Sequence, residues 1–377
     1  MKTKSPGIPS ASFSASIAGS TLPIAVLGAL LVMFSACSQP EPIHFGAILP
    51  LTGSGSMPEV KNGMELAVSE INETGGINGS PIELHVEDSA GSATVAVEKM
   101  QQMEKDGSFL LFFSALSSVT RAVSEVAEAE GIPLIGLIAT DPEIPANKRW
   151  TYVFYPDASH EAEPIFSVLL REGARTVGIV YQDDAYGRSV VQEMKLRSGR
   201  TMVTVDSHPF TGEQSELNDA VRSFMNHDAV YFVGFAANIL NMHEVFAQAD
   251  YEGIMLSTST ATIPSLRRDS GLDGVYVAAP LIYNESFVLA REVSQQYQDR
   301  YDQTLNHYAA TGYEVINVLA GLLDGQEPDR AQVIDVLRKG FIYPGIFGEI
   351  TLYAGENNMF FPLYPAVIEG KDLRYVR

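Results

Sequence analysis

From residue 43 onward, apolar runs of strand length alternate with segments in which apolar residues recur at helical spacing. Residues 43–49 are almost continuously apolar, as expected for a strand that is covered on both faces. In the segment 61–71, Met64, Ala67 and Ile71 instead share one face of a helix. By these criteria the first half of the chain contains strands at 43–49, 82–86, 109–113 and 133–136, and helices at 61–71, 93–105 and 120–130.

The same alternation restarts after residue 157. It predicts helices at 161–171, 185–196, 215–225 and 239–249, and strands at 176–181, 202–205, 229–233 and 253–256. Repeated β–α units imply parallel sheets with helices on both faces, because each crossover is long and right-handed. The pattern therefore predicts an α/β protein with two doubly wound parallel-sheet lobes.

The C-terminal part of the chain adds helices at 286–301, 308–323 and 330–337, and strands at 349–353 and 363–368. These elements are too few for a third domain, so we expect them to complete both lobes. The backbone must then cross between the lobes more than once. The resulting division is a signal peptide at 1–36, a tether at 37–42, a first lobe of 43–157 plus 283–346, and a second lobe of 158–282 plus 347–377.

The N-terminus has the pattern of an export signal. Lys2 and Lys4 precede an apolar run at 22–36, which at about 15 residues is too short to span a bilayer. Small residues directly before Cys37 resemble the lipobox of bacterial lipoproteins, in which the cysteine is acylated. Cys37 is the only cysteine, so an internal disulfide is excluded, and a buried thiol is the alternative to lipidation. We expect an exported protein held at the periplasmic or extracellular face of the membrane by lipid on Cys37.

The composition of the chain disfavours several classes of partner and of chemistry. The net charge of −21 disfavours nucleic acid, because an acidic surface repels phosphate backbones. The seven histidines form no His-x-x-x-His or cysteine-containing motif, so we expect no metal site. Neither a nucleophile elbow nor a Walker loop occurs, so we expect no cofactor and no enzymatic activity.

Several segments, taken in order, resemble one known family. They are FGAILPLTGSGSMPEVKNGMELAVSEINETGGINGS, VAEAEGIPLIGLIATDPEI, GIVYQDDAYGRSV, YAATGYEVINVLAGLL and FGEITLYAGENNMFFPLYPAVIEG. They are similar to the branched-chain amino-acid-type solute-binding proteins of ABC transporters, also called type I periplasmic binding proteins. The resemblance covers residues 43–370 and implies two lobes joined by a multi-stranded hinge. It also implies a small-molecule ligand in the cleft between the lobes and an ABC transporter permease as partner.

Two loops match the ligand loops of that family. Ser117 and Ser118 follow the strand at 109–113, and Ile138, Ala139 and Thr140 follow the strand at 133–136. The resemblance implies that the hydroxyl groups of Ser117 and Thr140, and the main chain of Ala139 and Thr140, bind a ligand carboxylate. Helix capping is the alternative role for the two serines.

The second lobe supplies aromatic candidates. Tyr186 stands in the Asp-Ala-Tyr-Gly motif, where the resemblance implies a side chain that closes over the ligand. Phe235 follows the strand at 229–233 and is expected at the same cleft, with core packing as its alternative. Asp183 and Asp184 precede a predicted helix, so we interpret them as N-caps and not as an acid–base pair.

Ser259 marks a departure from the family pattern. The resemblance places an acid here to pair with a ligand ammonium, yet the segment 257–262 contains only serine, threonine and alanine. A buried ammonium without a counter-charge costs several kcal/mol. We therefore expect a carboxylate- or amide-bearing ligand that lacks an ammonium group. The alternative is a ligand-free or sensory envelope lipoprotein that regulates a membrane or cell-wall protein.

Overall fold

The computed structural model describes residues 40–53, 55–269 and 271–376. The predicted export signal and Cys37 lie outside the described residues. From Glu41 onward the chain forms one compact unit. Within the described part, no helix combines the length and the apolar character that a membrane crossing requires.

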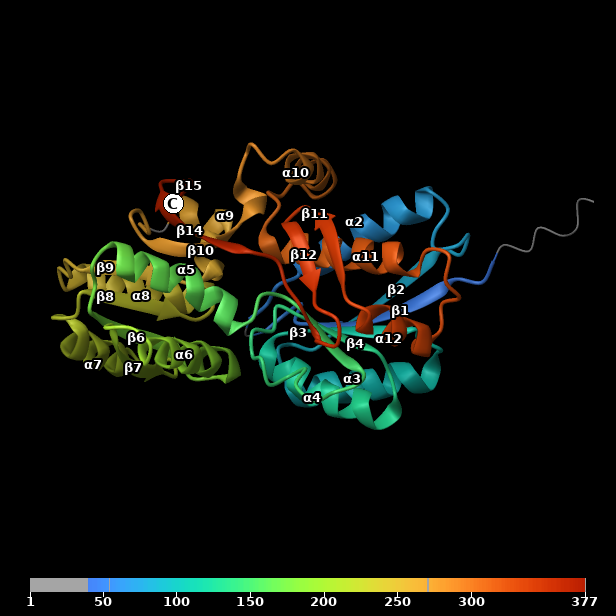
Figure 1. Ribbon diagram of the computed structural model, residues 1–377, viewed down its shortest axis with the longest axis horizontal. Coiled ribbons are helices and arrows are strands. Elements are labelled where there is room, and N and C mark those ends of the chain that lie inside the picture. Colours follow the sequence, from blue (N-terminus) through green and yellow to red (C-terminus); the bar gives the residue numbers. More distant parts are fainter. Residues whose placement is uncertain (1–39, 54, 270, 377) are drawn as a thin grey trace, which may run out of the picture. The chain divides into compact units, whose positions relative to one another are not determined.

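The first sheet has six strands, all parallel, in the order β13-β5-β4-β3-β1-β2. Its strands are β1 (Ile43–Leu49), β2 (Ile82–Asp88), β3 (Leu111–Ala115), β4 (Leu134–Leu137), β5 (Thr151–Phe154) and β13 (Asn358–Met359). Figure 1 shows helices on both faces of this sheet. These helices are α2 (Glu59–Glu73), α3 (Ala93–Asp106), α4 (Ser117–Glu130), α11 (His307–Leu323) and α12 (Arg330–Arg338).

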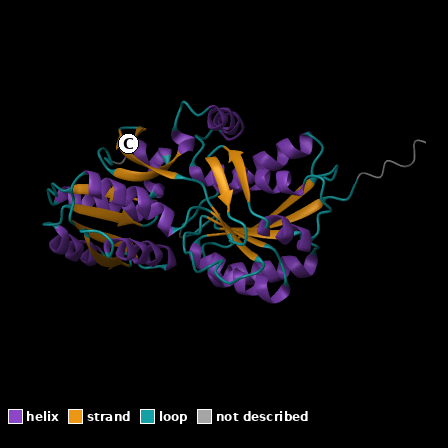
Figure 2. Ribbon diagram, viewed as in Figure 1, coloured by secondary structure: helices purple, strands orange, loops and turns teal. Residues whose placement is uncertain are grey.

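The second sheet has seven strands in the order β15-β14-β10-β9-β8-β6-β7. Its strands are β6 (Thr176–Gln182), β7 (Thr204–Phe210), β8 (Ala229–Val233), β9 (Ile254–Ser257), β10 (Tyr276–Pro280), β14 (Leu363–Glu369) and β15 (Asp372–Tyr375). Helices again flank the strands (Figure 2): α5 (Ala158–Arg171), α6 (Ala185–Ser198), α7 (Gln214–Phe224), α8 (Ala236–Gln248) and α9 (Pro264–Asp269). The two predicted α/β lobes are confirmed, with β14 and β15 added as antiparallel strands.

The chain passes between the two sheets at three places: after β5, after β10 and between β13 and β14. After the second passage it forms α10 (Val288–Tyr301), α11 and α12, and then the hairpin of β11 (Phe341–Gly345) and β12 (Gly348–Leu352). Because β13 pairs with β5, the last passage lies between Met359 and Leu363, later than the break expected after residue 346. Figure 1 shows β14 continuing from this region into the second sheet.

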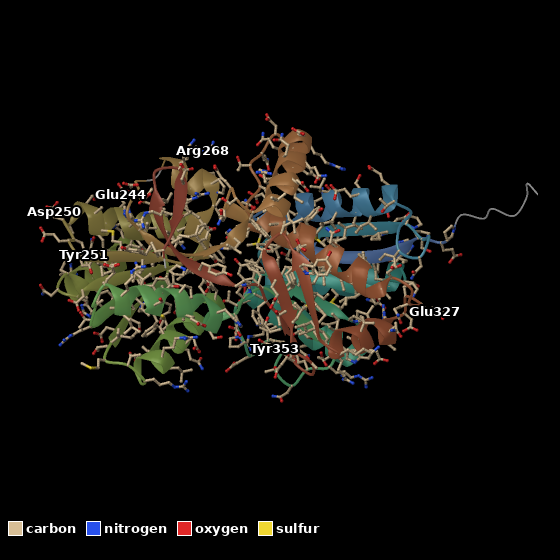
Figure 3. The ribbon with its side chains drawn as sticks, turned by 45° about the horizontal axis from the view of Figure 1, so that its top comes forward. Glu244, Asp250, Tyr251, Arg268, Glu327 and Tyr353 are labelled. Atoms are coloured by element: carbon tan, nitrogen blue, oxygen red, sulfur yellow. The ribbon has the colours of Figure 1, made fainter. Side chains whose placement is uncertain are left out.

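Polar residues cover the outside of both lobes. Glu244, Asp250 and Glu327 are exposed acidic residues of this surface (Figure 3), and the surface is the expected location for the excess of acidic over basic residues. Tyr353, also visible in Figure 3, is a large exposed aromatic side chain that directly follows β12.

Helices α2 and α11 touch backbone to backbone at two glycines. A Cβ atom on Gly63 would overlap the carbonyl oxygen of Ala309, and one on Gly312 would overlap the carbonyl oxygen of Val60. Both obstacles are backbone atoms, so the helices would have to separate to accept a methyl group. This contact holds α11 against α2 within the first lobe.

The Gly312→Ala variant is therefore expected to lower the free energy of unfolding by about 1–3 kcal/mol, the usual cost of overpacking. Gly321→Ala on the same helix is the matched control, because a Cβ there meets only the ring of Tyr343 at 3.6 Å, an ordinary contact. The control should be neutral or stabilising, since alanine favours helix over glycine by roughly 0.5–1 kcal/mol. Denaturant unfolding of both variants measures the difference, and equal stabilities would contradict the close-contact argument.

Candidate functional site

A pocket lies where the carboxyl ends of strands from both sheets meet. This is the edge at which open α/β sheets bind ligands, because the loops after the strands converge there. The pocket is lined from the first lobe by Leu116, Ser117, Ile138, Thr140 and Tyr308, from the second lobe by Glu161, Tyr186, Phe235, Ser259 and Thr260, and by Tyr155 at the first passage between the lobes.

The structure brings most of the predicted site residues to this pocket. Those lining it are Ser117, Ile138, Thr140, Tyr186, Phe235 and Ser259. Ser118 lines an adjoining pocket beside Phe235, and Ala139 is buried between its neighbours without being among the lining residues. The lining residues that sequence reasoning missed are Leu116, Tyr155, Glu161, Thr260 and Tyr308.

Ser117 connects the two predicted ligand loops. Its hydroxyl oxygen accepts a hydrogen bond from the backbone N–H of Thr140 at 3.1 Å, and both residues are buried. Leu116, not a serine, is the N-cap of α4, and no side chain caps this helix end. The alternative of helix capping by Ser117 is thus wrong. The uncapped N–H groups and the positive end of the α4 dipole favour an anion at this point.

The backbone is strained in both loops. Leu116 has φ +76° and Ile138 has φ +52°. Residues other than glycine rarely adopt positive φ values. Ile138 is β-branched, which makes this conformation especially unfavourable. Such strain costs about 1–3 kcal/mol per residue and persists at sites whose geometry serves binding. Both residues line the pocket.

Glu161 places an acid in the pocket. It lies in the first turn of α5, where one carboxylate oxygen accepts from the backbone N–H of Ser259 at 2.6 Å. The other oxygen, Oε2, is buried and has no hydrogen-bond partner among the described residues. Burial raises the pKa of the Glu161 carboxyl group, because the charged form loses its hydration.

The cleft therefore contains a buried acid that the sequence around Ser259 does not reveal. The segment around Ser259, which forms a 3-10 turn at Ser259–Thr262, indeed lacks an acidic residue, but Glu161 reaches it from another element. Glu161 is almost 100 residues away in the sequence, so only the folded chain brings the two together. No Lys or Arg is among the residues that line the pocket, so none of them supplies a counter-charge.

Aromatic side chains form the remaining walls. The rings of Tyr186 and Phe235 lie 6.0 Å apart between centroids, and the Tyr155 hydroxyl lies 3.2 Å from the Ser259 hydroxyl. Burial raises the pKa of both Tyr155 and Tyr186, so these side chains remain neutral hydrogen-bonding groups. The pocket thus combines apolar faces with a few polar groups, as small-molecule sites do.

The two aspartates before α6 have separate structural roles. Asp184 caps the helix by accepting from the backbone N–H of Gly187 at 2.8 Å, which confirms the prediction for this residue. Asp183 pairs with Arg188 at 2.6 Å instead, so its predicted capping role is wrong.

The walls are close together in this structure. The cavity volume is about 20 Å³, enough for roughly one water molecule. Contacts across the pocket include the Thr140 and Ser189 hydroxyl groups at 3.4 Å and the Tyr155–Ser259 pair. A ligand of amino-acid size must therefore move the walls apart to enter, and it would be largely enclosed once bound.

Known proteins resemble this chain in sequence. A family model described as "Periplasmic binding protein" matches residues 42–372. The chemotactic signal transduction system substrate-binding protein BasB of Halobacterium salinarum is 25% identical over 309 residues, which cover 77% of this chain and 73% of that protein. The Leu/Ile/Val-binding protein homolog 8 of Brucella suis is 27% identical over 201 residues, 49% of this chain and only about half (50%) of that relative.

The fold itself matches solved structures. The branched-chain amino acid transporter substrate-binding protein LivJ of Streptococcus pneumoniae, in complex with isoleucine, superimposes with a TM-score of 0.78 at 18% identity. The match covers 89% of this chain and 99% of LivJ. Since the family model spans nearly all of the two-lobed unit, the chain belongs to the periplasmic binding protein family.

Proposed function

We propose that this protein is an extracytoplasmic solute-binding protein that captures a small carboxylate-bearing ligand for uptake by an ABC transporter. The observation that carries the proposal is that one pocket contains both groups that favour an anion and an acidic group. The uncapped N-terminus of α4 with the Ser117 and Thr140 hydroxyl groups favours an anion, and the buried Glu161 carboxyl group lies in the same pocket.

Glu161 favours an α-amino acid as the ligand. Its unpartnered Oε2 is costly if charged, unless a cation pairs with it. A ligand ammonium supplies this cation, while the ligand carboxylate binds at Ser117 and Thr140. Tyr186 and Phe235 then offer apolar contact to a side chain. The isoleucine bound to LivJ and the Leu/Ile/Val-binding name of the Brucella relative support this class.

An amide or a deaminated acid remains the competing ligand class. If Glu161 keeps its proton, as its raised pKa favours, its O–H donates to an acceptor on such a ligand.

Export and the lipid anchor on Cys37 belong to the proposal as well, and palmitate labelling of wild type and Cys37→Ala in a bacterial host tests them.

A thermal-shift screen tests the binding proposal. Leucine, isoleucine and valine, their deaminated acids and their amides are compared at increasing concentration. A ligand at 100 times its dissociation constant stabilises the folded state by about 2.7 kcal/mol. A concentration-dependent rise in melting temperature with at least one compound is expected, and calorimetry then gives its affinity.

A second candidate function is that of a sensory or regulatory envelope lipoprotein. It is favoured by the similarity to BasB, whose name places that protein in a chemotactic signalling system. Absence of any stabilisation across the screen would contradict the solute-binding proposal and favour the ligand-free form of this alternative.

A further inference from the structure

Three side chains with metal-binding atoms converge on the edge of the first sheet. β1 and β2 pair in parallel, with His44 opposite Glu83 and Gly46 opposite His85. Glu83 and His85 are two residues apart on one strand, so they point to the same face. The register places both of them beside His44 on the neighbouring strand. No sequence motif reveals this cluster, because His44 is 41 residues from His85.

The ligand atoms have the spacing of a metal's coordination sphere. His44 Nδ1 lies 3.0 Å from His85 Nε2 and 3.4 Å from Glu83 Oε2, and His85 Nε2 lies 3.7 Å from the same carboxylate oxygen. A tetrahedral ion with bonds of about 2.0–2.1 Å separates its ligand atoms by about 3.3 Å. The three atoms therefore need to move by only a few tenths of an ångström to bind one ion.

We propose that His44, Glu83 and His85 form a binding site for a first-row transition metal ion of the zinc class. Two imidazole nitrogens with one carboxylate suit Zn²⁺, whereas Ca²⁺ and Mg²⁺ prefer oxygen ligands alone. The exposed side-chain fractions of 34%, 54% and 44% leave the cluster accessible to an ion from solvent. Three protein ligands leave a fourth position for water.

The surroundings hold the two imidazoles in place. The ring of Phe109, itself buried, meets His85 edge-on at 5.2 Å between centroids and His44 at 6.4 Å. Phe109 thus provides an apolar contact for both imidazole rings. The cluster begins at the start of β1, whereas the ligand pocket lies at the carboxyl ends of the strands, so the metal site is separate from the solute site.

Calorimetric titration of the full chain, produced without a histidine tag and stripped with chelator, tests the site with Zn²⁺ alone. One equivalent of zinc is expected to bind. His44→Gln, His85→Gln and Glu83→Gln should each weaken binding by roughly tenfold or more, since even residues that only orient metal ligands change affinity by 10–100-fold. His227→Gln is the matched control, because the His227 side chain pairs with Asp206 at 2.9 Å, outside the cluster.

Two further readouts separate a metal site from a structural contact. Zn²⁺ should raise the melting temperature of wild type and of His227→Gln but not of His44→Gln, while Mg²⁺ should change none of them. Co²⁺ should give the visible absorption of a tetrahedral site in wild type and in His227→Gln but not in His44→Gln. Zinc binding that is equally strong in His44→Gln and His85→Gln, or no binding by wild type, would overturn the proposal. Neither result depends on the solute ligand.

Discussion

Replacing Glu161 by glutamine should weaken leucine binding by roughly 30-fold or more, while binding of 4-methylpentanoate, the same skeleton without its amino group, should change little. The physical reason is the lost charge. Removing one partner of a buried, hydrogen-bonded charge pair costs about 2–5 kcal/mol. Glutamine keeps an acceptor for the backbone N–H of Ser259 but offers no negative charge to an ammonium. Isothermal titration calorimetry with the two compounds measures the effect.

Glu163→Gln provides the matched control, because Glu163 lies on the same helix, two residues away, and is exposed. Its affinity for both compounds should equal that of wild type. Unchanged leucine binding in Glu161→Gln would contradict the ammonium pairing. It would favour instead a protonated Glu161 that donates to an acceptor on the ligand, a role that the glutamine amide can reproduce.

The free energy of unfolding should fall by about 3 kcal/mol between pH 4.5 and pH 7 through Glu314 alone. Burial raises the pKa of this carboxyl group from 4.5 to about 7. Glu314 lies on α11 and accepts from the backbone N–H of Ile346 at 3.0 Å. As the pH rises through this window, the unfolded chain releases the proton while the folded protein retains it. The stabilising contribution of Glu314 is thus largest below pH 4.5 and is lost as the pH rises through about 7.

Denaturant unfolding of wild type and Glu314→Gln across this window measures the contribution as a difference. Glutamine keeps the acceptor and has no proton to lose, so the variant's advantage over wild type should grow as the pH rises and level off above about 7. Glu327→Gln, at an exposed position, should show no such trend. A constant difference between wild type and Glu314→Gln would contradict the prediction. The pKa of Asp157 is about 2, and His160 helps to lower it. Asp157 therefore affects the free energy of unfolding in a separate, more acidic pH range.

The strands and helices with strong periodicity were predictable from the sequence. Continuous apolar runs predicted β1 and β8 at their observed bounds, and helical spacing located α2 and α11 within a few residues. β5 and β13, by contrast, were not predicted. β5 has four residues and β13 has two, and each is a strand only because it pairs with a neighbour in the sheet. A pairing partner far away in the chain leaves no local pattern.

The residues of the candidate site likewise include some that the sequence predicted and some that it did not. The loops after β3 and β4 were predicted because the carboxyl ends of parallel strands meet at one edge. Glu161 and Tyr308 were missed, because each lies at the start of a helix and not in a loop directly after a predicted strand. Nothing local distinguishes Glu161 from other glutamates at helix starts. Its role depends on the contact with Ser259.

The sequence by itself determined the α/β class, the two-lobed organisation and the edge at which the site lies, because alternating apolar runs encode parallel β–α units locally. Only the tertiary structure decided the chemistry at that edge. It placed an acid in a pocket that the neighbouring sequence left without one, and it brought His44 beside Glu83 and His85 across two strands. Both arrangements arise from the register and packing of distant segments, which set the distances between functional atoms.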